Sequence, residues 1–319
     1  MSDNKIIVPL IRFACVLTFL VIVIGAYTRL SNSGLGCPDW PGCYGKLIVP
    51  DKVENVNEAY LGRPLEHTKA WIEMVHRYVA SSLGLLILII AFMSWRKSTL
   101  SRIRLFASTL LLLVIFQGML GMWTVTLLLK PIIVLSHLLG GLTILSLLYW
   151  MALEQQPRQN NVINSGNRKL LPSVIVGVFI LVIQISLGGW TSTNYAALAC
   201  TDFPTCQDTW WPDMNFKEGF ILWRGLGIDY EGGVLDGSAR TAIHMTHRIG
   251  ALITSLIIIT IAIRAIKSGM KNIKITGCAI LTLLIVQVSL GIANIKLYLP
   301  LSVAVAHNGV AALLLLSLV

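Results

Sequence analysis

The chain has 319 residues, of which 55% are hydrophobic and only 13% are charged, and its mean hydropathy is +0.75. These values exclude a soluble globular domain and are typical of a polytopic membrane protein. The formal net charge of +10 arises mainly in short segments on one side, where thirteen Lys and Arg face only Asp3 and Glu154. This positive-inside pattern argues against a nucleic-acid partner and predicts a cytoplasmic N-terminus.

A helix that spans a bilayer needs about 20 predominantly apolar residues. Eight runs meet this requirement, so we expect an all-α membrane protein with eight transmembrane helices. The runs cover residues 8–28, 70–94, 105–128, 132–152, 172–192, 241–263, 275–297 and 301–319.

The second half of the sequence repeats the first. Both long outer loops contain the pattern C-x-D-x-P-x-C, beginning at Cys37 and at Cys200. The histidine-arginine pair that begins at His76 recurs at His247. A parallel repeat of four helices predicts two tandem four-helix bundles related by a pseudo-twofold axis along the membrane normal.

We therefore divide the chain into three parts. Residues 1–153 form the N-terminal half and residues 172–319 the C-terminal half. The polar stretch 154–171, which lacks hydrophobic periodicity, is the expected cytoplasmic linker.

Four histidines, His76, His137, His247 and His307, lie five to seven residues from an outer helix end, roughly 10 Å below the outer surface. Two imidazoles at one depth on neighbouring helices can bind a metal from opposite sides. Bis-histidine haem ligation suits the interior of a four-helix bundle, whereas zinc would lack a third and a fourth ligand. The simpler interpretation is that each histidine is a hydrogen-bonded packing residue.

Three charged residues accompany these histidines. Arg77 and Arg248 could pair with haem propionates at the outer interface, or could instead extend towards water. Glu73 lies three residues before His76, so on a helix the two share one face. Its equivalent in the second half is His244. Glu73 could therefore transfer protons at one haem only, or could be a solvated interfacial carboxylate.

Four of the six cysteines lie in the outer loops. Because the outer side is an oxidising compartment, we expect the disulfides Cys37–Cys43 and Cys200–Cys206. Either pair could staple its loop or exchange electrons and thiols.

Taken together, Glu73-x-x-His76-Arg77, His137, His247-Arg248, His307 and the paired cysteines over eight helices resemble the heme A synthase family. The resemblance covers nearly the whole chain. It implies an oxidoreductase that converts a ring methyl of haem O into a formyl group, through successive hydroxylations and loss of water. The product, haem A, serves terminal oxidases, so the family belongs to cytochrome oxidase biogenesis.

The resemblance also implies roles for individual residues. It places a haem b cofactor in the C-terminal half with His247 and His307 as axial ligands. Substrate haem O is placed near His76 and His137, with Glu73 as the essential acidic residue. The first cysteine pair, Cys37 and Cys43, matches the pair that has a functional role in part of the family.

Two other functions remain open at this point. A di-haem b electron carrier or quinol oxidoreductase would leave haem unmodified, and a haem transporter or chaperone would catalyse nothing. For the enzyme, the expected partners are membrane lipid, haem O, an electron donor or acceptor, haem O synthase and the cytochrome oxidase assembly machinery. We expect a multi-pass protein of the plasma membrane with both cysteine loops on the outer face.

Overall fold

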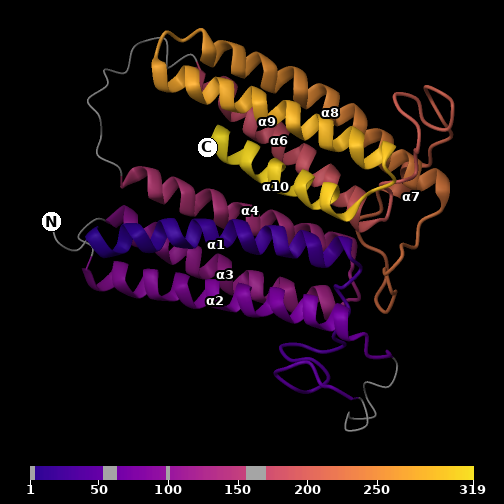
Figure 1. Ribbon diagram of the computed structural model, residues 1–319, viewed down its shortest axis with the longest axis horizontal. Coiled ribbons are helices and arrows are strands. Elements are labelled where there is room, and N and C mark those ends of the chain that lie inside the picture. Colours follow the sequence, from indigo (N-terminus) through magenta and orange to yellow (C-terminus); the bar gives the residue numbers. More distant parts are fainter. Residues whose placement is uncertain (1–3, 53–62, 98–100, 156–169) are drawn as a thin grey trace. The chain divides into compact units, whose positions relative to one another are not determined.

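The computed structural model describes residues 4–52, 63–97, 101–155 and 170–319. Its regular structure in these ranges is helical, and eight helices are long and apolar enough to span a membrane. The expected all-α membrane fold is therefore confirmed (Figure 1). The helices are α1 (Asn4–Leu30), α2 (His67–Lys97), α3 (Ser101–Thr126), α4 (Pro131–Glu154), α6 (Leu170–Thr193), the short α7 (Phe216–Gly219), α8 (Gly237–Ile266), α9 (Lys271–Lys296) and α10 (Leu301–Leu318).

The chain forms two compact units. One comprises Met1–Gln155 together with Leu222–Val234, and the other comprises Gln156–Ile221 together with Leu235–Val319. Most of the linker predicted at 154–171 lies outside the described residues.

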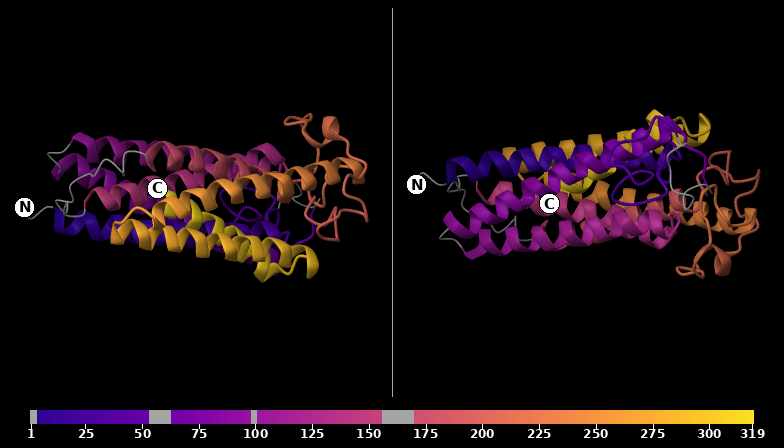
Figure 2. Two further views of the ribbon diagram at one scale, coloured as in Figure 1. Left: turned by 90° about the horizontal axis from the view of Figure 1, so that it is seen from above. Right: turned by 90° about the horizontal axis from the view of Figure 1, so that it is seen from below.

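The first unit contains a bundle in which α1 contacts α2 and α4, while α3 contacts the same two helices. These helices run side by side along their length (Figure 2). Each helix contributes to the core a side chain that is at most 1% exposed to solvent: Ile11, Ile87, Leu110 and Leu148. This core fills the inner half of the bundle. Apolar side chains also cover its outside, as expected where lipid replaces water.

The second unit has the same pattern of neighbours, with α6, α8, α9 and α10 in the places of α1, α2, α3 and α4. Backbone conformation repeats as well. Asn32 and Tyr195, which are equivalent in the repeat, have φ of 52° and 53° at the ends of α1 and α6. Leu129 and Leu299, also equivalent, have φ of 59° and 62° in the turns before α4 and α10. The two units therefore have the same arrangement of helices, as the repeat in the sequence predicts. The axis relating the two halves stays a prediction.

The helices that carry the first histidine of each half are longer than the hydrocarbon layer is thick. α2 has 31 residues and α8 has 30, so each is about 45 Å long, compared with about 30 Å for the hydrocarbon core. The Asp236 side chain caps α8 by accepting a hydrogen bond from the Ala239 backbone N–H at 2.7 Å. The first turns of these two helices therefore lie where the cysteine loops can contact them.

Residues 222–234, here called the crossover segment, belong by sequence to the second outer loop but pack against the first unit. The Lys130 ammonium, between α3 and α4, donates to the carbonyls of Arg224 at 2.8 Å and Gly225 at 2.7 Å. It also lies 3.6 Å from the centre of the Trp223 ring. Lys130 is only 2% exposed. Its charge is thus satisfied by the segment that it holds.

Two further contacts fix the crossover segment. Tyr230 is 3% exposed within an apolar cluster that includes Leu35 and Leu129. Arg63 forms ion pairs with Asp229 at 2.5 Å and Glu231 at 2.9 Å. The outer end of the first bundle is therefore covered by a segment that comes from the second half of the sequence.

Candidate haem site and the loops that frame it

In each bundle the two histidines lie in the half nearest the cysteine loop of that unit. In the first unit the His76 and His137 ring centres are 6.5 Å apart, and the ring planes are nearly perpendicular at 86°. In the second unit His247 lies on α8 and His307 on α10, the helices that take the places of α2 and α4. The predicted pairs therefore lie on equivalent helices, one pair in each unit.

A glycine on a neighbouring helix lies against each imidazole. A Cβ added to Gly25 would be 2.9 Å from Cε1 of His76, and one added to Gly188 would be 3.1 Å from Cε1 of His247. For Gly291 and His307 the distance is 3.2 Å, and for Gly121 and His137 it is 3.6 Å. The imidazoles therefore occupy space that exists because these positions have no side chain.

These residues fit a haem iron bound between two imidazoles. The His76 and His137 ring centres are 6.5 Å apart. Two metal–nitrogen bonds of about 2 Å each add up to about 4 Å, so one metal ion could be bound by both rings at this separation. Within the described residues, no group of three or more His, Cys, Asp and Glu could hold a metal ion. Two imidazoles are too few ligands for a zinc ion. They suit a haem, because the macrocycle itself supplies most of the iron ligands.

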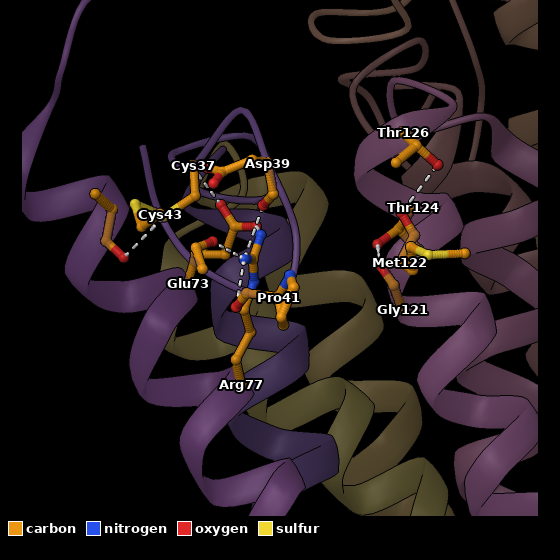
Figure 3. Close-up of polar contacts among 12 residues, drawn as sticks. Cys37, Asp39, Pro41, Cys43, Glu73, Arg77, Gly121, Met122, Thr124 and Thr126 are labelled. Carbon is orange, nitrogen blue, oxygen red and sulfur yellow. Dashed lines mark hydrogen bonds and ion pairs between the residues drawn. A yellow bond between two sulfur atoms is a disulfide. The ribbon is translucent and has the colours of Figure 1, made fainter. Parts of the chain in front are cut away.

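Glu73 faces the first cysteine loop. Its side chain is only 5% exposed. Oε2 accepts a hydrogen bond from the Cys37 backbone N–H at 2.8 Å, and Oε1 forms an ion pair with Arg77. Figure 3 shows Glu73 and Arg77 directed from α2 towards this loop. Glu73 is thus a buried, fully engaged carboxylate one helical turn from His76, and not a solvated one.

Arg77 and Arg248 bind loop carbonyls in the same way. Arg77 donates to the carbonyls of Asp39 at 2.9 Å and Gly42 at 2.5 Å. Arg248 donates to the carbonyls of Asp202 at 2.7 Å and Thr205 at 2.8 Å. Each arginine therefore holds its cysteine loop on the helix that carries a candidate ligand.

Both predicted disulfides, Cys37–Cys43 and Cys200–Cys206, are present. An aspartate inside each ring organises the loop. Asp39 accepts from the backbone N–H groups of Tyr44 and Gly45, and Asp202 does the same for Gln207 and Asp208. Hydrogen bonds, first from the Thr205 side chain and then from these N–H groups, lower the pKa of Asp202 to about 2.

The first loop also approaches α2 very closely. A Cβ on Gly36 would lie 2.6 Å from the carbonyl carbon of Lys69, so a residue larger than glycine does not fit there. This contact brings the Cys37 N–H to Glu73.

Several site residues were not identified from the sequence. The recurrence of Gly25 at Gly188 is visible in the repeat, but its meaning depends on the neighbouring imidazole. Gln184 contacts His247, and no repeat signal could have revealed it because its counterpart is Val21.

The chain is similar in sequence to proteins of one known family. Residues 10–319 match the COX15-CtaA family model, described as cytochrome oxidase assembly protein. The heme A synthase of Shewanella oneidensis is 47% identical over 314 residues, which cover 97% of this chain and 94% of that protein. The heme A synthase of Rhizorhabdus wittichii is 29% identical, covering 95% and 89%. That of Shouchella clausii is 28% identical, covering 88% and 83%. With a family match over almost its whole length, this chain belongs to the COX15-CtaA family of cytochrome oxidase assembly proteins.

Proposed function

We propose that this protein is a heme A synthase, a membrane oxidoreductase that converts a ring methyl of haem O into a formyl group. The observation that carries the proposal is the paired imidazoles, His76 with His137 and His247 with His307, in two bundles of one fold. The name shared by the relatives supports the same reaction. The alternative of a di-haem b electron carrier is not favoured, because the relatives compared above are named for haem A synthesis.

Within this function, His247 and His307 would hold haem b, which supplies one-electron transfer when bound. His76 and His137 would hold haem O. Arg77 and Arg248 would offer positive charge to the haem propionates.

Glu73 is the acidic residue of the substrate half. Its carboxylate is buried beside Arg77, and the same position in the second half holds His244, whose Nδ1 contacts the Ala196 carbonyl at 2.8 Å. Of these two equivalent positions, only the one in the half that would bind haem O therefore holds a carboxylate. We assign Glu73 to proton transfer during methyl oxidation, and the hydrogen bond from Cys37 to positioning that carboxylate.

Pigment extraction from purified protein tests the function. Cells supplied with haem O should yield haem b together with haem A or its hydroxymethyl precursor. We expect H247A and H307A to lose haem b, and H76A and H137A to keep haem b but lose the modified haem. Two haem b per chain, with no modified haem from cells rich in haem O, would refute the proposal in favour of the electron carrier.

The role of Glu73 needs a variant that keeps its hydrogen bonds. E73Q retains an oxygen that can accept from the Cys37 N–H, whereas E73A does not. If Glu73 transfers protons, E73Q will bind both haems yet form no haem A. Normal haem A output from E73Q would remove the catalytic assignment, and a defect confined to E73A would leave only the loop contact.

We place the N-terminus in the cytoplasm and both cysteine loops on the outer face of the cell membrane. The distribution of Lys and Arg supports this orientation, as do the two disulfides, which form in an oxidising compartment. Haem O synthase and the oxidase assembly machinery are the partners that this reaction requires. Labelling of single introduced cysteines by an impermeant maleimide in intact cells tests the orientation.

A further inference from the structure

Gln184, on α6, contacts the first histidine of the C-terminal bundle twice. Its Nε2 lies 3.0 Å from Nδ1 of His247 and also 3.0 Å from the backbone carbonyl oxygen of His247. One amide thus contacts both the ring and the main chain of a single residue. Rotation of the imidazole about its side-chain bonds would break the ring contact.

The helix opposite is shaped to admit this amide. A Cβ on Gly250, one turn after His247 on α8, would lie 2.4 Å from Oε1 of Gln184. Any larger residue at position 250 would push Gln184 away from His247. Gln184 and Gly250 therefore act as a matched pair.

The amide also has an unused acceptor. Oε1 of Gln184 is buried and has no hydrogen-bond partner, an arrangement that costs free energy. When an imidazole binds a metal through Nε2, its Nδ1 carries a proton and needs an acceptor. Turning the amide by half a revolution exchanges Nε2 for Oε1 and supplies that acceptor, in place of the hydrogen bond to the His247 carbonyl. With haem bound, the amide would therefore hold His247 through its ring.

The N-terminal bundle lacks this pair. The positions equivalent to Gln184 and Gly250 are Val21 and Val79. Nδ1 of His76 is correspondingly buried without a partner. Neither valine can donate to or accept from an imidazole. Between the two first histidines, only His247 is held by a side-chain amide.

We propose that Gln184 is a positioning residue that fixes His247 and makes the C-terminal bundle retain its haem, while the unbraced His76 lets the N-terminal bundle release its haem. The inference rests on the proposed function, because it takes His247 as a ligand of haem b and the N-terminal bundle as the site of substrate turnover. An acceptor on Nδ1 increases the basicity of the ligating nitrogen, which strengthens the bond to ferric iron. A resident cofactor requires such a ligand, whereas a substrate that must leave as product does not.

Two measurements on the full-length protein loaded with haem b test the proposal: the rate of haem transfer to excess apomyoglobin and the reduction midpoint potential. Q184M has a similar length but no amide. It should release haem b about 10- to 100-fold faster, the range for loss of such a partner, and its midpoint potential should rise. Q184E offers a stronger acceptor and should lower the midpoint potential. Unchanged release and potential in Q184M, or shifts of the same sign in both variants, would overturn the proposal.

Exchange of the pairs gives the matched control. Q184V/G250V installs the valine pair of the N-terminal half and should release haem b as fast as Q184M does. V21Q/V79G installs the amide beside His76 and should slow haem release from the N-terminal bundle. Wild-type release rates from both double variants would refute the inference.

The H247A variant separates this inference from the function. If H247A keeps haem b with an unchanged absorption spectrum, the ligand assignment itself fails. If H247A loses haem b while Q184M behaves as wild type, the function stands and only the role of Gln184 is refuted.

Discussion

Replacement of the glycines that face the imidazoles should remove haem from one bundle at a time. Optimal carbon–carbon contacts lie at about 3.5–4.0 Å. Because a Cβ on Gly25 would be 2.9 Å from Cε1 of His76, G25A must displace that ring by about 0.6 Å. The same change at Gly188, where the distance is 3.1 Å, must displace His247 by about 0.4 Å.

These displacements are large for a ligand, because metal–ligand distances in working sites hold to within about 0.2 Å. Overpacking of this kind costs about 1–3 kcal/mol, which corresponds to roughly a 5- to 150-fold loss of haem affinity. G188A should therefore lose haem b. G25A should keep haem b and lose the haem of the N-terminal bundle.

Two glycines on α3 provide a graded control. A Cβ on Gly121 would be at an ordinary 3.6 Å from Cε1 of His137, and one on Gly118 would meet nothing within 4 Å. G121A should have a small effect and G118A none. Haem content per chain, measured by pyridine haemochrome and by electron paramagnetic resonance of the low-spin ferric signals, reports the result. Equal haem loss in G25A and G118A, or full haem retention in both G25A and G188A, would refute the reasoning.

Three further changes probe the segments that connect the helices. Lys130→Met removes a charge that donates two hydrogen bonds to the crossover segment, so tryptic cleavage after Arg224 should become roughly tenfold faster or more. Arg63→Gln breaks only part-exposed ion pairs, so its effect should be smaller and should vanish at high salt. For Asp202 the folded pKa of about 2 lies below the ordinary 3.8, so its stabilisation is present above pH 4 and is lost as the pH falls through about 2. Reduction of the second-loop disulfide by an acid-tolerant phosphine should accelerate over that range in the wild type, whereas Asp202→Asn should be fast throughout.

The sequence predicts the features of this fold that depend on local composition. The eight spans follow from hydropathy, because a backbone inside a membrane must satisfy its own hydrogen bonds as helix. The placement of His76, His137, His247 and His307 on equivalent helices follows from their spacing, because a duplicated bundle returns equivalent residues to equivalent places. Cysteines close together in an outer loop pair locally, so the disulfides were also predictable.

The contacts that depend on how loops return to the bundles were not predictable. Glu73 meets the N–H of Cys37 only because Gly36 lets the loop backbone approach α2. From the sequence alone, Lys130 would be predicted to be an ordinary lysine at the membrane interface. It is buried because the crossover segment returns from the second outer loop to the first unit. Neither periodicity nor spacing encodes such long-range packing.

The two halves share a scaffold and differ where its chemistry would differ. Arg77 and Arg248 hold the cysteine loops through the same carbonyl contacts, so these arginines belong to the shared scaffold. In the second half His244 contacts the Ala196 carbonyl, upstream of the disulfide ring. In the first half Glu73 contacts the N–H of Cys37, a member of the ring, with a carboxylate one turn from His76. A change in the first disulfide would therefore reach a charged group beside the proposed substrate site, whereas His244 provides no such link in the second half. The two cysteine loops are equivalent, but Glu73 links the first disulfide ring to the helical turn that carries His76. Its counterpart His244 makes no such link to the ring in the second half.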